Sequence, residues 1–322
     1  MFIQLTQKIM NKCLYCYQEL EGTNDFHDRC AIIFFGVNKV PILDYTFDQM
    51  SLLAKNVVER SISVPGVQAK LSMSLINDLT SDNKRLTVVG ALGGNYIFKP
   101  PNTNYPEMPE NEHLTMRIAE AFGINTVPST LIRLKSGELS YLTKRIDRKL
   151  DGSKIHMLDM FQITEAFDKY RSSMERIGRA IGIYTNNTLL DKLYFFEVTL
   201  FSFITGNNDM HLKNFSMIQT NSGWALAPAY DLLNVAIVNP EDTEELALSI
   251  AGKKKKFTRS NFEEFGLSLG LTSKQVVSTF NRFQKHKKEA VNWVENSFLS
   301  DNMKINYLKV LEERYVRISE KE

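Results

Sequence analysis

Cysteine is scarce in this chain, whose 322 residues include only three, all near the start. An odd number of thiols in one short stretch excludes a disulfide framework. Together with one histidine they form C-x-x-C followed by H-x-x-C, from Cys13, Cys16, His27 and Cys30. Three thiolates and one imidazole could complete a tetrahedral Zn²⁺ site, and four protein ligands would make that zinc structural. The sequence equally allows metal-free cysteines in a small knuckle.

The chain also lacks long apolar runs and an excess of charge of one sign. No stretch approaches the ~20 apolar residues of a membrane span, and the first residues lack the apolar run of a signal peptide. We therefore expect a cytoplasmic protein with no membrane partner. Its 39 basic and 37 acidic residues give a net charge of +2, too small to indicate nucleic-acid binding by itself. With 43% apolar residues, the chain can build a sizeable core or two lobes.

The first half of the chain has the pattern of an antiparallel sheet. Short apolar runs separated by turn residues cover residues 57–99, and residues 71–75 alternate strictly. The runs are Val57-Val58, Leu71-Ser72-Met73-Ser74-Leu75, Val88-Val89 and Tyr96-Ile97-Phe98. Two more strands are expected at residues 131–132 and 141–143, across the turn at Ser136-Gly137.

Helices dominate the second half. One helix is expected from Pro109 to Gly123, and others over residues 189–204 and 276–294. The fold class predicted is α+β, with a sheet-rich N-lobe, a mostly helical C-lobe and a Cys-rich N-terminal knuckle. We expect the knuckle at residues 1–36, the N-lobe at 37–142 and the C-lobe with the catalytic loop at 143–322.

The residues typical of chemistry gather between positions 206 and 231. Asp209 and Asn214 form D-x-x-x-x-N after an apolar helix, and a predicted hairpin then returns the chain to Asp231. Phosphoryl transfer uses such a set: a carboxylate accepts the substrate hydroxyl proton, while an Asn and a second carboxylate hold magnesium. We predict Asp209 as the base and Asn214 with Asp231 as the Mg²⁺ ligands. An isolated D-x-x-x-x-N is more often a polar turn.

The first half offers complementary groups. Residues 61–70 lie where a phosphate-covering loop would lie, with Val64, Gly66, Val67 and Gln68 as candidate contacts, although a single glycine is a weak signal. Lys99 ends a strand and could reach phosphate oxygens, with Glu112 as its ion-pair partner. A lone lysine before prolines is otherwise usually a solvated charge. Residues 142–147 would join the lobes and bond adenine through their backbone.

Six motifs follow one another across about residues 57–235. They read S-I-S-V-P-G-V-Q-A-K, Y-I-F-K-P, P-E-N-E, L-T-K-R-I-D-R, G-N-N-D-M-H-L-K-N-F-S and A-P-A-Y-D-L-L-N. In this order they resemble the HipA family of bacterial serine/threonine kinase toxins. The short first half most resembles HipT, the compact toxin of the three-component HipB-HipS-HipT systems. The Cys-rich head lies outside the resemblance.

This resemblance implies a protein-kinase-like fold, Mg-ATP as substrate, and phosphorylation of a serine in an aminoacyl-tRNA synthetase, which would inhibit translation. It implies that Ser61 and Ser63 are autophosphorylated and that Lys144 with Ile146 presents hinge backbone to adenine. Lys144 departs from the acidic residue expected there. The implied partners are HipB- or HipS-like antitoxins, with DNA contacted only indirectly through an antitoxin.

Two other functions fit parts of the same pattern. An aminoglycoside-type phosphotransferase also uses Asp-x-x-x-x-Asn, but it needs an acidic pocket, and residues 241–245 form the only dense acidic cluster after position 235. An inactive kinase-like binding module would not need Asp209, Asn214 and Asp231 to be intact. His211 could order the loop, touch the substrate or be purely structural. The lysine run at 253–256 could bind nucleic acid or a partner, or form a solvated face.

Overall fold

The computed structural model describes residues 11–60, 70–78, 81, 83–89, 93–149 and 151–319, with side chains from 56 to 60 excepted. The chain forms two compact units. The first consists of Met1–Pro101 and Pro128–Lys144, and the second of Asn102–Val127 and Arg145–Glu322. Residues 102–127 therefore belong to the second unit, although the N-lobe was predicted to extend over residues 37–142.

A five-stranded antiparallel sheet forms the centre of the first unit, in the order β4-β3-β5-β7-β6. Its strands are β3 (Leu71–Asn77), β4 (Lys84–Val89), β5 (Tyr96–Lys99), β6 (Ser129–Arg133) and β7 (Leu139–Lys144). The alternation over residues 71–75 predicted one buried face, and Leu71 and Met73 are indeed buried while Ser72 and Ser74 are partly exposed. These strand predictions are confirmed.

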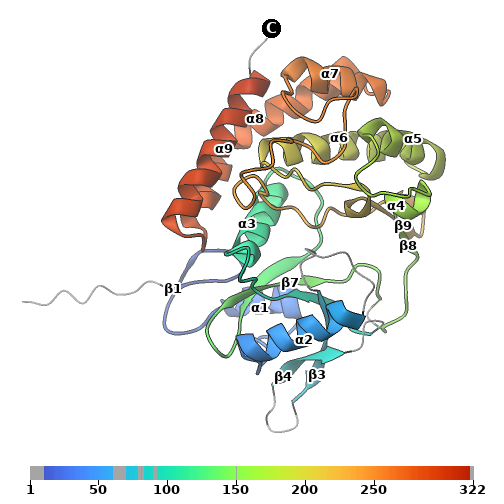
Figure 1. The fold of residues 1–322 in the computed structure, drawn as a ribbon. Coiled ribbons are helices and arrows are strands. Elements are labelled where there is room, and N and C mark those ends of the chain that lie inside the picture. Colours follow the sequence, from blue (N-terminus) through green and yellow to red (C-terminus); the bar gives the residue numbers. More distant parts are fainter. Residues whose placement is uncertain are drawn as a thin grey trace, which may run out of the picture. The chain divides into compact units, whose positions relative to one another are not determined.

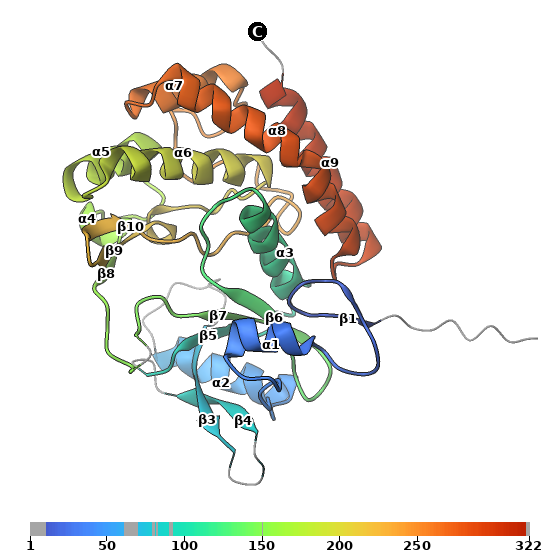
Figure 2. The same ribbon diagram turned by 180° about the vertical axis from the view of Figure 1, so that it is seen from behind.

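Two helices accompany this sheet, α1 (Asp28–Phe35) and α2 (Phe47–Arg60), together with a short ribbon of β1 (Asn11–Lys12) and β2 (Glu19–Leu20) (Figures 1 and 2). The predicted strand at Val57-Val58 is wrong because both residues lie in α2. Met50 and Ala54, four residues apart, are both buried on this helix. The helical period over residues 47–60 outweighs the β preference of two adjacent valines.

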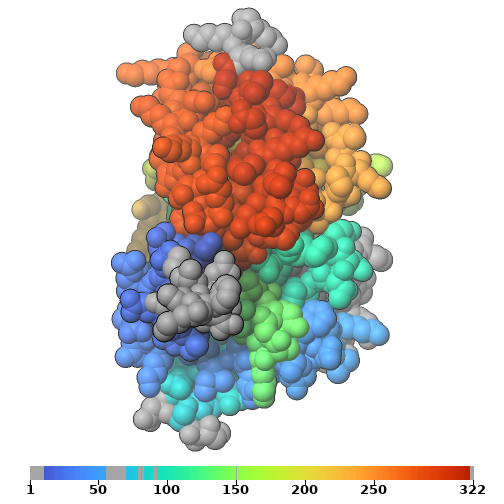
Figure 3. Space-filling view, turned by 90° about the vertical axis from the view of Figure 1, so that its left-hand side faces the viewer, coloured from blue at the N-terminus to red at the C-terminus, as the bar shows by residue number. Residues whose placement is uncertain are grey.

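The second unit is mostly helical, and its core is aromatic. Its helices are α3 (Met108–Ala121), α4 (Met160–Ile163), α5 (Met174–Tyr184), α6 (Thr188–Ile204), α7 (Arg259–Ser268), α8 (Ser273–Asn296) and α9 (Asp301–Ser319). Phe195, Phe196, Phe201 and Phe203 on α6 are all buried. The long helices α8 and α9 pack side by side and form a continuous surface (Figure 3). The helices predicted near 109–123, 189–204 and 276–294 are confirmed.

A hairpin lies between α6 and α7 along the chain. Strands β9 (Ser216–Thr220) and β10 (Gly223–Leu226) pair as predicted, and β8 (Met157–Asp159) adds a third strand beside β9. The 3₁₀ turn η1 (Leu212–Asn214) leads into β9. The hairpin therefore reverses the chain direction between Asp209 and Asp231. Within the described residues, no helix is both long and apolar enough to cross a bilayer.

Candidate functional site

The loop after α6 depends on a glycine. Gly206 follows the helix C-cap with φ of 70°, and a Cβ built on it would lie 2.7 Å from Asn234 Oδ1. A larger residue would therefore meet both backbone strain and a close neighbour. The sharp turn at Gly206 directs the chain into Asn207, Asn208 and Asp209.

Asp209 and Asn214 are joined directly. The Asn214 side-chain nitrogen donates to the Asp209 carbonyl at 3.0 Å, and the Asn214 amide donates to the His211 carbonyl at 2.9 Å. With its nitrogen used in this bond, Asn214 has Oδ1 as the atom that could ligate a cation. The five-residue spacing of the motif is therefore the spacing that closes this turn.

Asn207 connects the loop to Asp231. Its Oδ1 accepts from the Asp209 amide at 3.3 Å, and its Nδ2 donates to the Asp231 carbonyl at 3.4 Å. Asn207 is fully buried. Asp231 has a φ of 55°, a left-handed conformation that is uncommon for a residue other than glycine and that costs free energy. One buried amide thus fixes the backbone of both carboxylates.

Tyr170, which belongs to none of the sequence motifs, bonds the predicted base. Its hydroxyl donates to Asp209 Oδ1 at 2.8 Å, and its ring packs edge-on against His211 with centroids 5.0 Å apart. Burial and the negative charge of Asp209 raise the pKa of Tyr170, so the hydroxyl stays protonated. No sequence signal linked a lone tyrosine to a motif 39 residues further along the chain.

His211 lies within the electrostatic reach of both carboxylates. Burial lowers its pKa below the usual value of histidine, although Asp209 and Asp231 oppose that shift. Its Nδ1 is buried without a hydrogen-bond partner among the described residues. A neutral His211 adds no positive charge beside the carboxylates of Asp209 and Asp231, whose negative charge suits a divalent cation.

The predicted phosphate-binding residues belong to different units. Lys99, in the first unit, is only 3% exposed, and its ammonium lies 5.3 Å from the centroid of the Tyr141 ring. Glu112, on α3 in the second unit, is 1% exposed. Lys99 is therefore not the solvated surface charge that the sequence alone allowed, and Glu112 is buried as well. Their ion pair stays a prediction.

The predicted hinge coincides with the passage between the units, between Lys144 and Arg145. The Lys144 amide already donates to the Pro128 carbonyl at 3.0 Å. Its ammonium lies 5.4 Å from the centroid of the Phe34 ring, and burial lowers the pKa of Lys144. Ile146 is half-buried in the turn that follows. The expectation that both residues bond adenine stays a prediction.

The predicted phosphate-covering loop lies outside the described residues. This applies to Ser61, Ser63, Val64, Gly66, Val67 and Gln68. The structure does place the four predicted zinc ligands together, since their ligand atoms all lie within 4.8 Å of one another. Among the sites predicted in the first unit, the structure therefore brings together the four candidate zinc ligands of the knuckle.

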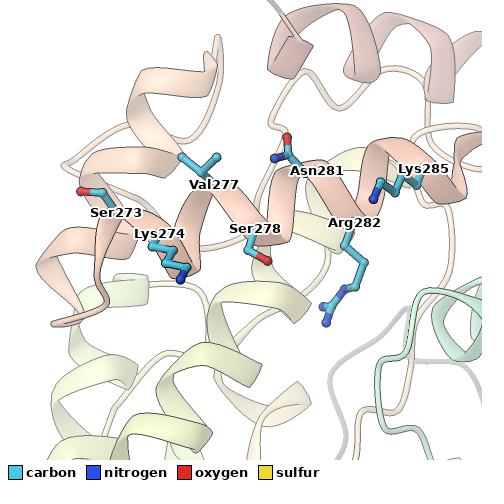
Figure 4. A pocket seen from close by; sticks show the side chains of 7 residues that line it. All are labelled: Ser273, Lys274, Val277, Ser278, Asn281, Arg282 and Lys285. Carbon is cyan, nitrogen blue, oxygen red and sulfur yellow. The ribbon is translucent and has the colours of Figure 1, made fainter.

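Two surface features fall outside the site. A hollow along α8 is lined only by residues of that helix, shown in Figure 4: Ser273, Lys274, Val277, Ser278, Asn281, Arg282 and Lys285. The lysine run at 253–256 lies in a loop, where Lys254 pairs with Glu244 at 3.1 Å. The acidic segment at 241–245 thus partly neutralises that run.

Comparison with known proteins identifies the family. Residues 62–291 match the HipA-like C-terminal domain family. A putative kinase of Sinorhizobium fredii, Y4dM, is 31% identical over 248 residues, which cover 72% of this chain and 59% of that protein. The serine/threonine-protein kinase toxin HipA of Shewanella oneidensis is 27% identical over 259 residues, covering 71% of this chain and 56% of that protein. The chain thus spans little more than half the length of these relatives.

Solved structures show the same fold. A chain of the Shewanella oneidensis complex of HipA, HipB and operator DNA superposes with a TM-score of 0.64 at 21% identity, covering 82% of this chain and 70% of that one. The Helicobacter pylori proinflammatory kinase CtkA gives a TM-score of 0.51 at 15% identity, covering 69% and 87%. The α+β architecture is therefore kinase-like. On the match over residues 62–291, this chain belongs to the HipA-like C-terminal domain family.

Proposed function

We propose that this protein is an ATP-dependent serine/threonine protein kinase that acts as the toxin of a toxin-antitoxin system. The observation that carries the proposal is the hydrogen-bonded loop in which Asn214 bonds the Asp209 carbonyl and Asn207 links Asp209 to Asp231. Kinase chemistry needs a base and two cation ligands held in fixed register. Relatives described as putative kinases and as a HipA kinase toxin support the same assignment.

In this proposal Asp209 accepts the proton of a serine hydroxyl as that oxygen bonds the γ-phosphorus of ATP and ADP leaves. Asn214 Oδ1 and the Asp231 carboxylate are hard oxygen donors, the type that Mg²⁺ prefers. Magnesium, when bound, would neutralise charge on the transferring phosphoryl group. Lys99 would contact phosphate oxygens, with Glu112 orienting it. Val64, Gly66, Val67 and Gln68 would cover the phosphates, and Lys144 with Ile146 would bind adenine.

The acceptors proposed are of two kinds. The target in the cell is a serine of an aminoacyl-tRNA synthetase, and loss of that enzyme would inhibit translation. The second is the protein itself, at Ser61 and Ser63, where a phosphate near Gly66 would repel the phosphates of ATP. We propose HipB- or HipS-like antitoxins as partners. A solved complex of HipA with HipB and operator DNA supports such partners. We propose that any contact with DNA is indirect, through the antitoxin.

Incubation with γ-labelled ATP and magnesium tests the activity. We expect label on Ser61 or Ser63 in the wild type and none in Asp209→Asn, with growth inhibition lost in parallel. Asp301→Asn, an exposed carboxylate on α9, is the matched control and should retain both. Equal labelling of the Asp209→Asn protein would refute the proposed base. Phosphoproteomic comparison of cells expressing wild type and Asp209→Asn would reveal whether a synthetase is the target.

A further inference from the structure

The N-terminal cluster has the dimensions of a tetrahedral metal site. His27 Nδ1 lies 3.5 Å from Cys16 Sγ and 3.8 Å from Cys30 Sγ. With metal bonds of about 2.3 Å to sulfur and about 2.0 Å to nitrogen, a regular tetrahedron has S···N edges of about 3.5 Å. Cys13 completes the group, with all four ligand atoms within 4.8 Å of one another. A cation at the centre therefore needs little rearrangement of these side chains.

The histidine is also oriented for metal binding. His27 Nε2 lies 3.0 Å from the Glu19 carbonyl, so the ring donates Nε2–H there and keeps the lone pair of Nδ1 toward the sulfurs. Metal-ligating histidines typically donate their other ring nitrogen to a carbonyl or carboxylate in this way. Cys13 and Cys30 are buried, with exposures of 0% and 2%. Gathering three thiolates, two of them buried, is costly without a cation, whereas an S₃N donor set suits Zn²⁺.

We propose that Cys13, Cys16, His27 and Cys30 bind one structural Zn²⁺ that fastens the N-terminal knuckle to the sheet of the first unit. This site lies before residue 62 and is therefore outside the segment that matches the family. Because all four positions are protein ligands, no position remains for a substrate. The zinc acts on folding and leaves the chemistry of phosphoryl transfer to other residues.

The knuckle is hydrogen-bonded to the edge strand β6 through two residues that lie between the proposed zinc ligands in the sequence, Leu14 and Asp25. The carbonyl of Leu14, between Cys13 and Cys16, accepts from the Leu131 amide at 3.3 Å. The carboxylate of Asp25, shortly before His27, accepts three hydrogen bonds from Arg133, at 3.1 and 3.2 Å from Nε and at 3.0 Å from Nη2. Zinc would fix the relative positions of these two attachment points. Without it, two separate chain segments must be ordered by weaker contacts.

The same zinc would anchor the start of α1. Cys30 lies in the first turn of this helix, and the Cys30 amide bonds the His27 carbonyl at 2.9 Å. Further along α1, Phe34 packs on Tyr96 of β5 and lies beneath the Lys144 ammonium. The metal site is thus connected through one short helix to the end of β7, where the chain leaves the first unit.

Metal analysis of the purified full-length protein is the direct test. We expect about one equivalent of zinc in the wild type and in His286→Ala, a control at a histidine on α8, and a loss of zinc in His27→Ala. His27→Cys should retain it, because four thiolates also bind zinc. Since these three cysteines are the only ones in the chain, a thiol reagent reports on the cluster alone. A chelator should convert slowly reacting thiols into three rapidly reacting ones.

Two further measurements keep the test independent of variants that fail to fold. Co²⁺ added to chelated wild type should give the visible absorption of thiolate-bound cobalt, and the chelated protein should melt at a lower temperature until zinc is restored. Less than half an equivalent of zinc together with no cobalt spectrum would overturn the proposal. An unchanged melting temperature after complete zinc removal would overturn its stabilising role.

A separate contact, at the proposed catalytic loop, carries a second inference that rests on the proposed kinase function. An acceptor serine must donate its hydroxyl proton to Asp209, yet Tyr170 already donates to Asp209 Oδ1 at 2.8 Å. Tyr170 lies between α4 and α5, a segment that also includes the fully exposed Phe167. We infer that the Tyr170 hydroxyl occupies the acceptor position and must move away before a serine can react.

Basal hydrolysis of ATP by water tests this, because it needs no knowledge of the protein substrate. Tyr170→Phe removes the hydroxyl and keeps the ring on His211, so we expect hydrolysis to rise several-fold. Tyr184→Phe, on an exposed tyrosine, should not change it. Unchanged or lower hydrolysis in Tyr170→Phe would overturn the inference. A wild type that does not exceed Asp209→Asn in labelling or hydrolysis would instead refute the kinase function itself.

Discussion

Asn207 and Asn208 are adjacent and buried, but their side chains bond different segments of the chain. Asn207 bonds the backbones of Asp209 and Asp231, whereas Asn208 donates to the Glu244 carbonyl at 3.1 Å. Replacing either by alanine leaves buried polar groups without partners, which costs about 1–3 kcal/mol of unfolding free energy. Because, of these two asparagines, Asn207 is the one that links the backbones of Asp209 and Asp231, we expect Asn207→Ala to lose most phosphoryl transfer.

To separate the two roles, the stability and the activity of both alanine variants are measured. Urea denaturation should show similar losses for Asn207→Ala and Asn208→Ala, while labelling with ATP falls at least tenfold further in the first. Equal activity of the two variants would show that the Asn207 bonds are dispensable for the loop.

His211 gives a pH dependence of stability. Burial lowers its pKa, so the folded protein binds this proton less readily than the unfolded chain. Its stabilising effect is complete above the unfolded pKa of about 6.5 and is lost as the pH falls through the lower folded value. We therefore expect His211→Asn to flatten the fall in unfolding free energy between pH 7 and 5. Urea melts at several pH values, with His286→Asn as the control, measure this difference.

Sequence spacing identified some of these residues and missed others for a physical reason. Asp209 and Asn214 were found because one turn joins them, and Asp231 because a hairpin is visible in the sequence. Tyr170 and the bridging role of Asn207 depend on contacts between segments 24 to 39 residues apart. Such contacts leave no pattern in the neighbouring sequence, because the identity of a tyrosine or an asparagine does not show which distant residue its side chain contacts.

At the level of elements, an ion pair joins α6 and α8, and its carboxylate is far less exposed than its guanidinium. Arg282 reaches away from α8 (Figure 4) and lies 2.7 Å from Glu197 of α6, whose side chain is 9% exposed. Burial raises the pKa of Glu197, and Arg282 partly opposes this shift. Removing the arginine would leave a buried carboxylate without its countercharge, which is more costly than losing an exposed pair.

We expect Arg282→Met to lower the unfolding free energy by about 2 kcal/mol, between the values typical of buried and exposed pairs. Lys287→Met is the control, because Lys287 pairs at 2.7 Å with Glu312, which is 61% exposed, and should cost under about 1 kcal/mol. Adding Glu197→Leu to Arg282→Met should restore much of the loss. Urea denaturation of the three proteins decides this, and equal losses for both single variants would contradict it.

The elements themselves were predictable where their periodicity was long or strict. The 24 residues of α8 and the alternation in β3 were both found. The strand at Val57-Val58 was wrong because two residues carry too little periodicity to outweigh a helix. Strand β8 was missed since its three residues form a strand only through pairing with β9.

For the whole molecule, the balance of charge predicts weak binding to nucleic acid. The net charge is +2, and the lysine run at 253–256 faces an acidic segment and pairs with it through Lys254. We expect the protein alone to bind duplex DNA only at the micromolar level or weaker near physiological salt, typical of non-specific contact. Fluorescence anisotropy with labelled DNA measures this. Nanomolar affinity without an antitoxin would contradict an indirect contact with DNA.

The sheet of the first unit has both edges partly closed by other segments of the same chain. At β4, Ile42 exchanges hydrogen bonds with Lys84 and Leu86, and at β6 the Leu14 carbonyl accepts from Leu131. A foreign peptide that binds by β-augmentation needs a row of open backbone groups along an edge strand. Neither outer strand offers a continuous row of this kind. A protein that recognises this unit would therefore have to contact mainly its side chains, which makes recognition sensitive to point mutation.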